Sequence, residues 1–146
     1  MKAIETALSL TQAYKLGIER FEKMLGNEFS KAVESMNNTS THIIICGMGK
    51  SGLVGRKISS TLASTGTPSI FLHPAEAIHG DLGKVHKQSV VLLISYSGET
   101  GEIISLIPAL KRLDVTIIGL TGVKNSTLAS KSDIVLDTSV DREACP

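Results

Sequence analysis

The chain has 146 residues, which is enough for one domain with a buried core. Its 15 Lys and Arg residues nearly balance its 14 Asp and Glu residues, and the net charge of +1 argues against a protein that coats nucleic acid or an anionic membrane. Aromatic residues make up 3% of the chain and Trp is absent, so we expect an aliphatic core without aromatic platforms for stacking bases.

The N-terminal part of the sequence predicts helices. Apolar residues recur every three or four positions and form one stripe: Tyr14, Ile18, Phe21, Leu25, Phe29 and Val33. The Gly26-Asn27 pair predicts a break, which divides the segment into helices at about residues 3–25 and 27–37. A turn is expected at residues 37–40.

The pattern changes after this turn to short strands that alternate with helices. Continuous aliphatic runs, typical of strands buried on both faces, lie at residues 43–45, 69–72, 90–94, 115–120 and 134–136. Helical patterns lie between them at residues 53–63, 103–113 and 126–130. This alternation predicts an α/β fold with a doubly wound, five-stranded parallel sheet. No helical pattern follows the last strand, and we interpret the sequence as part of a longer protein.

Neither a membrane span nor a secretory signal is expected. The longest apolar runs, at residues 43–46 and 90–94, fall short of the roughly 18 residues that a membrane helix needs. The N-terminus lacks a basic head followed by an apolar stretch. Cys46 and Cys145 form no CxxC pair; one disulfide stays an alternative, and a reduced cytoplasmic protein is the simpler interpretation.

The first glycine-rich turn, residues 47–52, follows the first predicted strand. Its Gly47, Gly49 and Gly52 match the GxGxxG dinucleotide fingerprint, but no acidic residue stands about 20 positions later to hold a ribose. A P-loop would need glycine at position 44, which is Ile44. The remaining interpretations are a phosphate site at a helix N-terminus, built by Gly49, Lys50 and Ser51, or glycines that simply allow close packing.

The second turn, residues 95–100, follows the third predicted strand and is the more specific signal. Ser95, Ser97 and Thr100 place three hydroxyl groups around Gly98, and each hydroxyl can donate to a phosphate oxygen. Helix capping is the alternative, but it explains one hydroxyl rather than three. Because Glu99 and Glu102 would repel a phosphate, at least one of these carboxylates must face another way, toward the uncharged part of the ligand.

These segments resemble a known family. Residues 95–100 (SYSGET) are similar to the S-x-S-G-x-T phosphate loop of sugar isomerase (SIS) domains. Four further segments resemble the D-arabinose-5-phosphate isomerase family: residues 47–52 (GMGKSG), 65–68 (TGTP), 73–83 (HPAEAIHGDLG) and 143–146 (EACP). The resemblance runs from about residue 42 to the last residue.

The resemblance implies a three-layer α/β/α SIS fold with a five-stranded, flavodoxin-like or Rossmann-like sheet. A single SIS domain would occupy residues 1–146, with N-terminal helices at about 3–37 and the α/β core at about 41–146. Further C-terminal helices and a pair of CBS domains would lie outside this chain. The implied assembly is a homotetramer whose active sites are shared between subunits, without nucleic acid or membrane partners.

The implied activity is an intramolecular oxidoreductase reaction: D-ribulose 5-phosphate and D-arabinose 5-phosphate interconvert through a cis-enediol and supply the synthesis of KDO for lipopolysaccharide or capsule. Positions that match the family's active site are Lys50, His79, Glu102 and Glu143. A second histidine of the family lies beyond Pro146. Either Glu102 or Glu143 would be the base, Lys50 would stabilise the enediolate or the phosphate, and His79 would move protons between oxygens or open the sugar ring.

No cofactor is expected. The spacing of His73, His79 and His86 matches no helical metal pair, and acid–base isomerisation requires no metal. Two other functions stay open: an SIS isomerase of another sugar phosphate, and a non-catalytic SIS regulator that binds a sugar phosphate. The presence of all four matched positions favours an enzyme, and the lack of a preceding helix-turn-helix pattern weakens a DNA-linked regulator.

Overall fold

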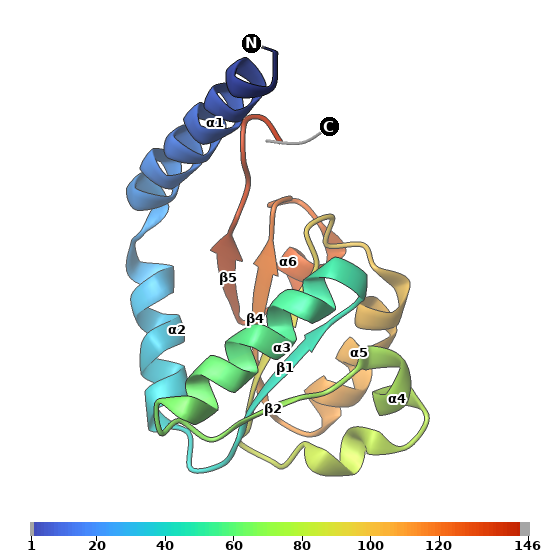
Figure 1. Cartoon of the computed structure of the whole chain (residues 1–146). Coiled ribbons are helices and arrows are strands. Elements are labelled where there is room, and N and C mark those ends of the chain that lie inside the picture. The colour runs from blue at the N-terminus through green and yellow to red at the C-terminus, as the bar shows by residue number, and fades with distance from the viewer. Residues whose placement is uncertain (1, 144–146) are drawn as a thin grey trace.

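The computed structural model describes residues 2–143 and shows a parallel sheet between two layers of helices (Figure 1). The strands are β1 (Ile43–Gly47), β2 (Ser69–Phe71), β3 (Val90–Ile94), β4 (Thr116–Thr121) and β5 (Ile134–Asp137). Their order across the sheet is β2-β1-β3-β4-β5, and every neighbouring pair is parallel. The predicted five-stranded parallel sheet is confirmed.

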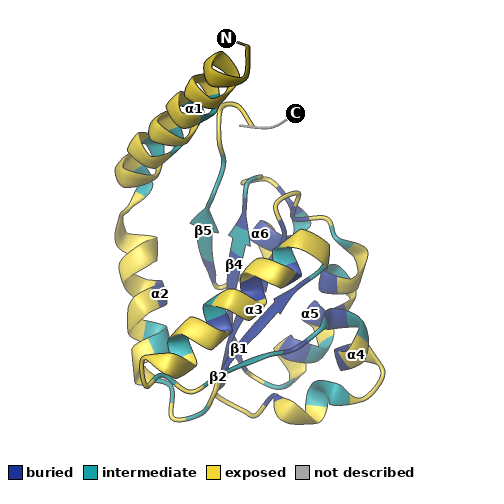
Figure 2. Cartoon of the chain, viewed as in Figure 1, coloured by how far each residue is buried: buried dark blue, intermediate teal, exposed yellow. Residues whose placement is uncertain are grey.

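Two aliphatic cores lie on opposite faces of the sheet, because successive strand residues point to opposite sides. On one face, Ile43 and Ile45 pack with residues of α2 (Asn27–Asn38) and α3 (Gly49–Ser64). On the other, Ile44 and Cys46 pack with residues of α4 (Pro74–Ile78), α5 (Gly101–Arg112) and α6 (Thr127–Lys131). All residues of β1 and β3 are buried, as their continuous apolar runs predict (Figure 2).

The strand order creates a switch point between β1 and β3. The chain leaves β1 toward β2 on one side and then returns to form β3 on the other side of β1. Ligands in open parallel sheets bind beyond the carboxyl ends of the strands at such a point. Gly47 at the end of β1 is paired with Ile94 at the end of β3, so the two predicted phosphate turns begin side by side.

The N-terminal segment forms two helices, as predicted, and they part at Gly26, the N-cap residue of α2. The first, α1 (Lys2–Met24), buries none of its residues and extends away from the sheet (Figures 1 and 2). The second, α2, packs against β5 and buries Ala32 there, so an N-terminal helix covers the edge strand. The predicted apolar stripe stays largely uncovered within the chain: its six side chains are 43–67% exposed.

Several boundaries differ from those predicted. The helix expected at residues 53–63 begins at Gly49, because the glycine turn is itself the first helical turn of α3. Similarly, α5 begins at Gly101 rather than at residue 103. The turn expected at residues 37–40 begins only after Asn38. The sequence reading missed α4 and the 3₁₀ turn at Asp81–Lys84, which are too short for a periodic pattern.

Across residues 2–143, no helix combines the length and the apolar character needed to cross a membrane.

Candidate functional site

The serine loop, residues 95–100, is held in shape by its own hydroxyl groups. The Ser95 side chain is buried, and its Oγ accepts a hydrogen bond from the Gly98 N–H at 3.1 Å. The same Oγ lies 2.7 Å from the Thr100 Oγ1. The exposed Ser97 Oγ accepts the Glu99 N–H at 3.2 Å. Thr100 is the N-cap residue of α5, so the loop leads directly into a helix N-terminus.

This arrangement leaves two hydroxyl protons for a ligand rather than three. Each hydroxyl carries one proton. The hydrogen bond between Ser95 and Thr100 uses one proton of that pair, whichever residue donates it. Because Ser95 is buried and Thr100 is only half-buried, burial favours donation by Ser95, which leaves the Thr100 proton available for another acceptor. The Ser97 hydroxyl accepts in the loop, so its proton is also available.

Gly98 is required at the centre of the loop for two reasons. Its φ is +68°, in the left-handed region that favours glycine. A Cβ atom at this position would also lie 2.0 Å from the Ser126 Oγ. The backbone of the serine loop therefore lies directly against the start of α6.

The glycine turn at residues 47–52 combines packing with an open N-terminus. A Cβ at Gly52 would lie 2.7 Å from the Gly47 carbonyl oxygen, so these two glycines allow the strand and α3 to approach closely. Gly49 instead has φ +52° and open space where its Cβ would be. The first helical hydrogen bond is the one that Gly52 donates to the Met48 carbonyl, so the earlier N–H groups have no partner within the helix. Lys50 is exposed here and Ser51 is half-buried.

Two glutamates, Glu99 and Glu102, lie in or next to the serine loop. Glu102 is the second residue of α5 and is exposed. The Glu99 Oε1 accepts a hydrogen bond from the Thr127 backbone N–H at 2.6 Å, and this bond lowers the pKa of Glu99. Glu99 therefore faces α6, away from the hydroxyl groups of the loop. That a carboxylate faces the uncharged part of a ligand stays a prediction.

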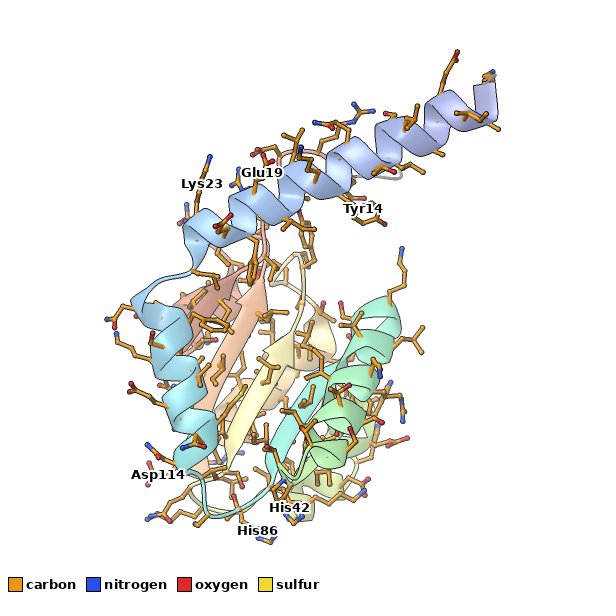
Figure 3. The ribbon with its side chains drawn as sticks, turned by 60° about the vertical axis from the view of Figure 1, so that its left-hand side comes forward. Tyr14, Glu19, Lys23, His42, His86 and Asp114 are labelled. Atoms are coloured by element: carbon orange, nitrogen blue, oxygen red, sulfur yellow. The ribbon has the colours of Figure 1, made fainter. Side chains whose placement is uncertain are left out.

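His79 is the C-cap residue of α4, and its side chain is exposed. Helix α4 packs against α5, which follows the serine loop. Figure 3 shows His86 and His42 at the opposite, amino-terminal end of the sheet. Within the described part of the chain, no three His, Cys, Asp or Glu side chains are grouped to hold a metal ion.

Glu143 lies near the serine loop although it follows β5 by several residues. It is exposed and lines a cavity of about 520 Å³ together with Tyr96 of the serine loop and Tyr14, Ile18 and Phe21 of α1. Figure 3 shows Tyr14 on the side of α1 that faces the rest of the domain. The Arg20 guanidinium holds this last segment to α1 through Asp141 and donates to the Ser139 Oγ at 3.0 Å.

Sequence reasoning missed Tyr96 as a member of this site. Its ring lies against Gly122, where a Cβ would be 2.4 Å from the ring atom Cε2. The lack of a side chain at Gly122, directly after β4, is the signal that makes room for the ring. Cys46, in contrast, is buried at the end of β1, and burial raises the pKa of its thiol to about 12, so it is not a nucleophile at neutral pH.

A parallel sheet with a switch point, a serine loop at a helix N-terminus and a lysine-bearing glycine turn define an α/β domain whose ligand edge suits a phosphate group. The SIS domain model matches residues 36–145, and the chain belongs to the SIS domain family. It is 52% identical to the arabinose 5-phosphate isomerase KdsD of Pseudomonas aeruginosa over 122 residues, which cover 84% of this chain and 37% of that protein. It is 49% identical to the arabinose 5-phosphate isomerase KpsF of Escherichia coli O6:H1 over 130 residues, with 88% and 40% covered.

The fold also matches a solved structure. A protein of Escherichia coli CFT073, solved in complex with arabinose 5-phosphate, superposes with a TM-score of 0.86 and 36% identity over 98% of this chain and 76% of that chain. The chain spans about two fifths of the length of the curated relatives it matches.

Proposed function

We propose that this chain is the SIS domain of an isomerase that interconverts D-ribulose 5-phosphate and D-arabinose 5-phosphate, and that the product supplies KDO synthesis. The observation that carries this proposal is the identity of about half of the aligned residues with arabinose 5-phosphate isomerases over most of the chain. The serine loop at the switch point agrees with it, because such an edge binds phosphate esters in parallel sheets.

The phosphate group of the substrate would bind between the serine loop and the glycine turn. Ser97 and Thr100 donate their hydroxyl protons, Ser95 and Gly98 hold the loop backbone, and the N-termini of α3 and α5 favour a negative charge. The N–H groups of the turn at Gly49 and Ser51 and the ammonium group of Lys50 add further donors.

The sugar chain would extend from this edge toward the acid–base residues. Isomerisation removes a proton from a carbon beside the carbonyl group and returns it to the neighbouring carbon through a cis-enediol. Glu102 or Glu143 would act as the base, and such a base accelerates the step by roughly 10²- to 10⁴-fold. Lys50 would stabilise the enediolate oxygen, and His79 would transfer protons between the oxygens or open the ring.

We also propose that the protein assembles as a homotetramer with active sites shared between subunits. Two observations support an assembly: α1 buries none of its residues within the chain, and the apolar stripe over both N-terminal helices is exposed. Exposed apolar surface of this kind marks an interaction site. A shared site would bring His79 to a neighbouring subunit's serine loop.

The test is incubation of the full-length protein with ribulose 5-phosphate in D₂O and identification of the product by NMR. We expect arabinose 5-phosphate with deuterium at C2, because the enediol exchanges its proton with solvent. Conversion of a different sugar phosphate would favour an isomerase of another substrate. Binding without any conversion would favour the non-catalytic regulator.

A further inference from the structure

Glu99 stands within the serine loop, where its charge is unfavourable for the proposed ligand. A carboxylate close to a phosphate dianion raises the energy of the bound state. In the structure this carboxylate is directed at the start of α6, where its Oε1 accepts the Thr127 backbone N–H at 2.6 Å. Hydrogen bonds to an ionised acceptor are stronger than those between neutral groups. The side chain thus removes its charge from the loop and adds a contact at the same time.

The contact belongs to a wider docking of the serine loop onto the segment after β4. The Leu128 N–H donates to the Gly98 carbonyl at 3.0 Å, and the Gly122 N–H donates to the Tyr96 carbonyl at 2.9 Å. Glu99 is held by hydrogen bonds at its side chain and at its backbone: its Oε1 accepts from the Thr127 N–H, and its own N–H donates to the Ser97 Oγ at 3.2 Å. The backbone of Glu99 is therefore coupled to the position of the Ser97 hydroxyl group.

We propose that Glu99 is a positioning residue for phosphate binding: its carboxylate fastens the serine loop to the Thr127 N–H, which fixes the Ser97 hydroxyl and keeps the carboxylate away from the phosphate. This inference rests on the proposed phosphosugar-binding function. Glu99 itself touches neither the phosphate nor the reacting carbons.

The chain offers a way to remove the donor without removing the glutamate. Thr127 is the first residue of α6, a position at which proline is well tolerated because its missing N–H has no helical partner. Ser126 before it has φ −80° and ψ 163°, which is the conformation that a residue before proline adopts. Thr127→Pro therefore deletes the N–H that Glu99 accepts and leaves the helix able to form.

The experiment measures calorimetric binding of inorganic phosphate and of arabinose 5-phosphate to the full-length protein and to four variants. We expect Glu99→Ala to weaken both by about fivefold, from the worth of one charge-assisted hydrogen bond at an exposed site. Thr127→Pro should match that loss, and the double variant should lose no more than either single one. Glu99→Gln, which keeps an acceptor oxygen, should recover part of the affinity. In turnover assays, Glu99→Ala should raise KM with kcat within about twofold of the wild type.

The control is Glu34→Ala, which removes an exposed carboxylate at the amino-terminal end of the sheet and should leave both affinities unchanged. Unchanged phosphate affinity in Glu99→Ala, or losses that add in the double variant, would overturn the inference. So would tighter binding in Glu99→Ala, since Glu99 would then act only as a repelling charge. Suppose that phosphate affinity falls in the Glu99 and Thr127 variants as expected, but the wild-type protein leaves arabinose 5-phosphate unconverted. That result would reject the proposed function and keep the positioning role of Glu99.

Discussion

Gly98 is the most restricted residue of the serine loop, and its restriction is a matter of both conformation and space. A side chain there would meet a left-handed backbone and the hydroxyl group of Ser126 at once. Neither constraint is visible in the spacing of the loop, which identifies the hydroxyl groups but not the helix on which they rest.

We expect Gly98→Ala to destabilise the fold by about 2–4 kcal/mol, from the strain of a left-handed alanine together with an overpacked contact. Thermal or urea unfolding measures this loss. Gly101→Ala is the matched control, because Gly101 is helical and has open space around its Cβ position. It should be neutral or stabilising. Equal stability of the two variants would mean that the loop yields to the added methyl group.

Under the proposed function, substitutions at Ser97 should affect substrate binding, whereas substitutions at Glu102 and Glu143 should affect the chemical step. We expect Ser97→Ala to raise KM by about tenfold, because it removes a hydroxyl donor to a charged group. Glu102→Gln and Glu143→Gln should instead lower kcat, with about a hundredfold or larger loss at whichever residue is the base. Steady-state kinetics on arabinose 5-phosphate measures both effects. A lower kcat with unchanged KM in Ser97→Ala would contradict this division.

Asp137 makes the stability depend on pH at the acid end. Partial burial raises its pKa, but the Ser139 N–H at 2.8 Å and the Lys124 ammonium at 3.1 Å together bring the pKa below its ordinary value of 3.8. A lowered pKa stabilises the folded state above pH 3.8, and this contribution disappears as the pH falls through the folded value.

We therefore expect Asp137→Asn to be less stable than the wild type at pH 6 and nearly equal to it at about pH 2. Urea unfolding over this range measures the difference. Glu34→Gln, an exposed carboxylate on α2, serves as the control and should follow the wild type at every pH. A constant gap between Asp137→Asn and the wild type would show that charge at Asp137 contributes nothing.

At the scale of elements, the sequence predicted strands better than helix ends. Each of the five strands carries a continuous aliphatic run and is recognisable from the sequence pattern, although only β1 and β3 are buried along their whole length. The start of α3 was not, because its first turn consists of glycine, lysine and serine and carries no apolar period. The five-residue helix α4 was missed because it is too short to show a periodic pattern, although Pro74 at its first position is a typical helix start.

Pro108 lies within α5, although proline has a low propensity for the interior of a helix. Proline in a helix interior removes a backbone hydrogen bond and clashes with the preceding turn. Pro108 is exposed, whereas Leu106, Ile107 and Leu110 hold α5 on the sheet. We expect Pro108→Ala to stabilise the fold by about 1–2 kcal/mol, measured by urea unfolding. Unchanged or reduced stability would indicate that the ring has favourable contacts of its own.

At the scale of the whole molecule, the sequence predicts that the serine loop, the glycine turn and Glu143 lie at one edge of the sheet, but it does not predict that the two turns are neighbours or that Glu143 lies beside Tyr96. The turns follow strands that an α/β pattern brings to one edge. The position of Glu143 beside Tyr96 depends on α1 and on an ion pair between Arg20 and Asp141, residues 121 positions apart. No periodicity encodes a contact at such separation.

The exposed apolar stripe of the N-terminal helices supports the proposed assembly. We expect Ile18→Glu together with Phe21→Glu to reduce the oligomeric state in sedimentation velocity, because both side chains are exposed apolar groups on α1. Lys15→Glu, an exposed charge change on the same helix, serves as the control. An unchanged sedimentation coefficient in the double variant would place the subunit contacts elsewhere.

The cavity that contains Glu143 lies between α1 and the segment after β5. Its walls come from α1, from the segment after β5 and from Tyr96 of the serine loop, whereas the hydroxyl groups of the loop and the glycine turn follow the central strands β3 and β1. Under the proposed function, truncation of α1 would open the cavity beside Glu143 and leave in place the strands that carry the serine loop and the glycine turn. Phosphate binding and isomerisation would then depend on different parts of the chain.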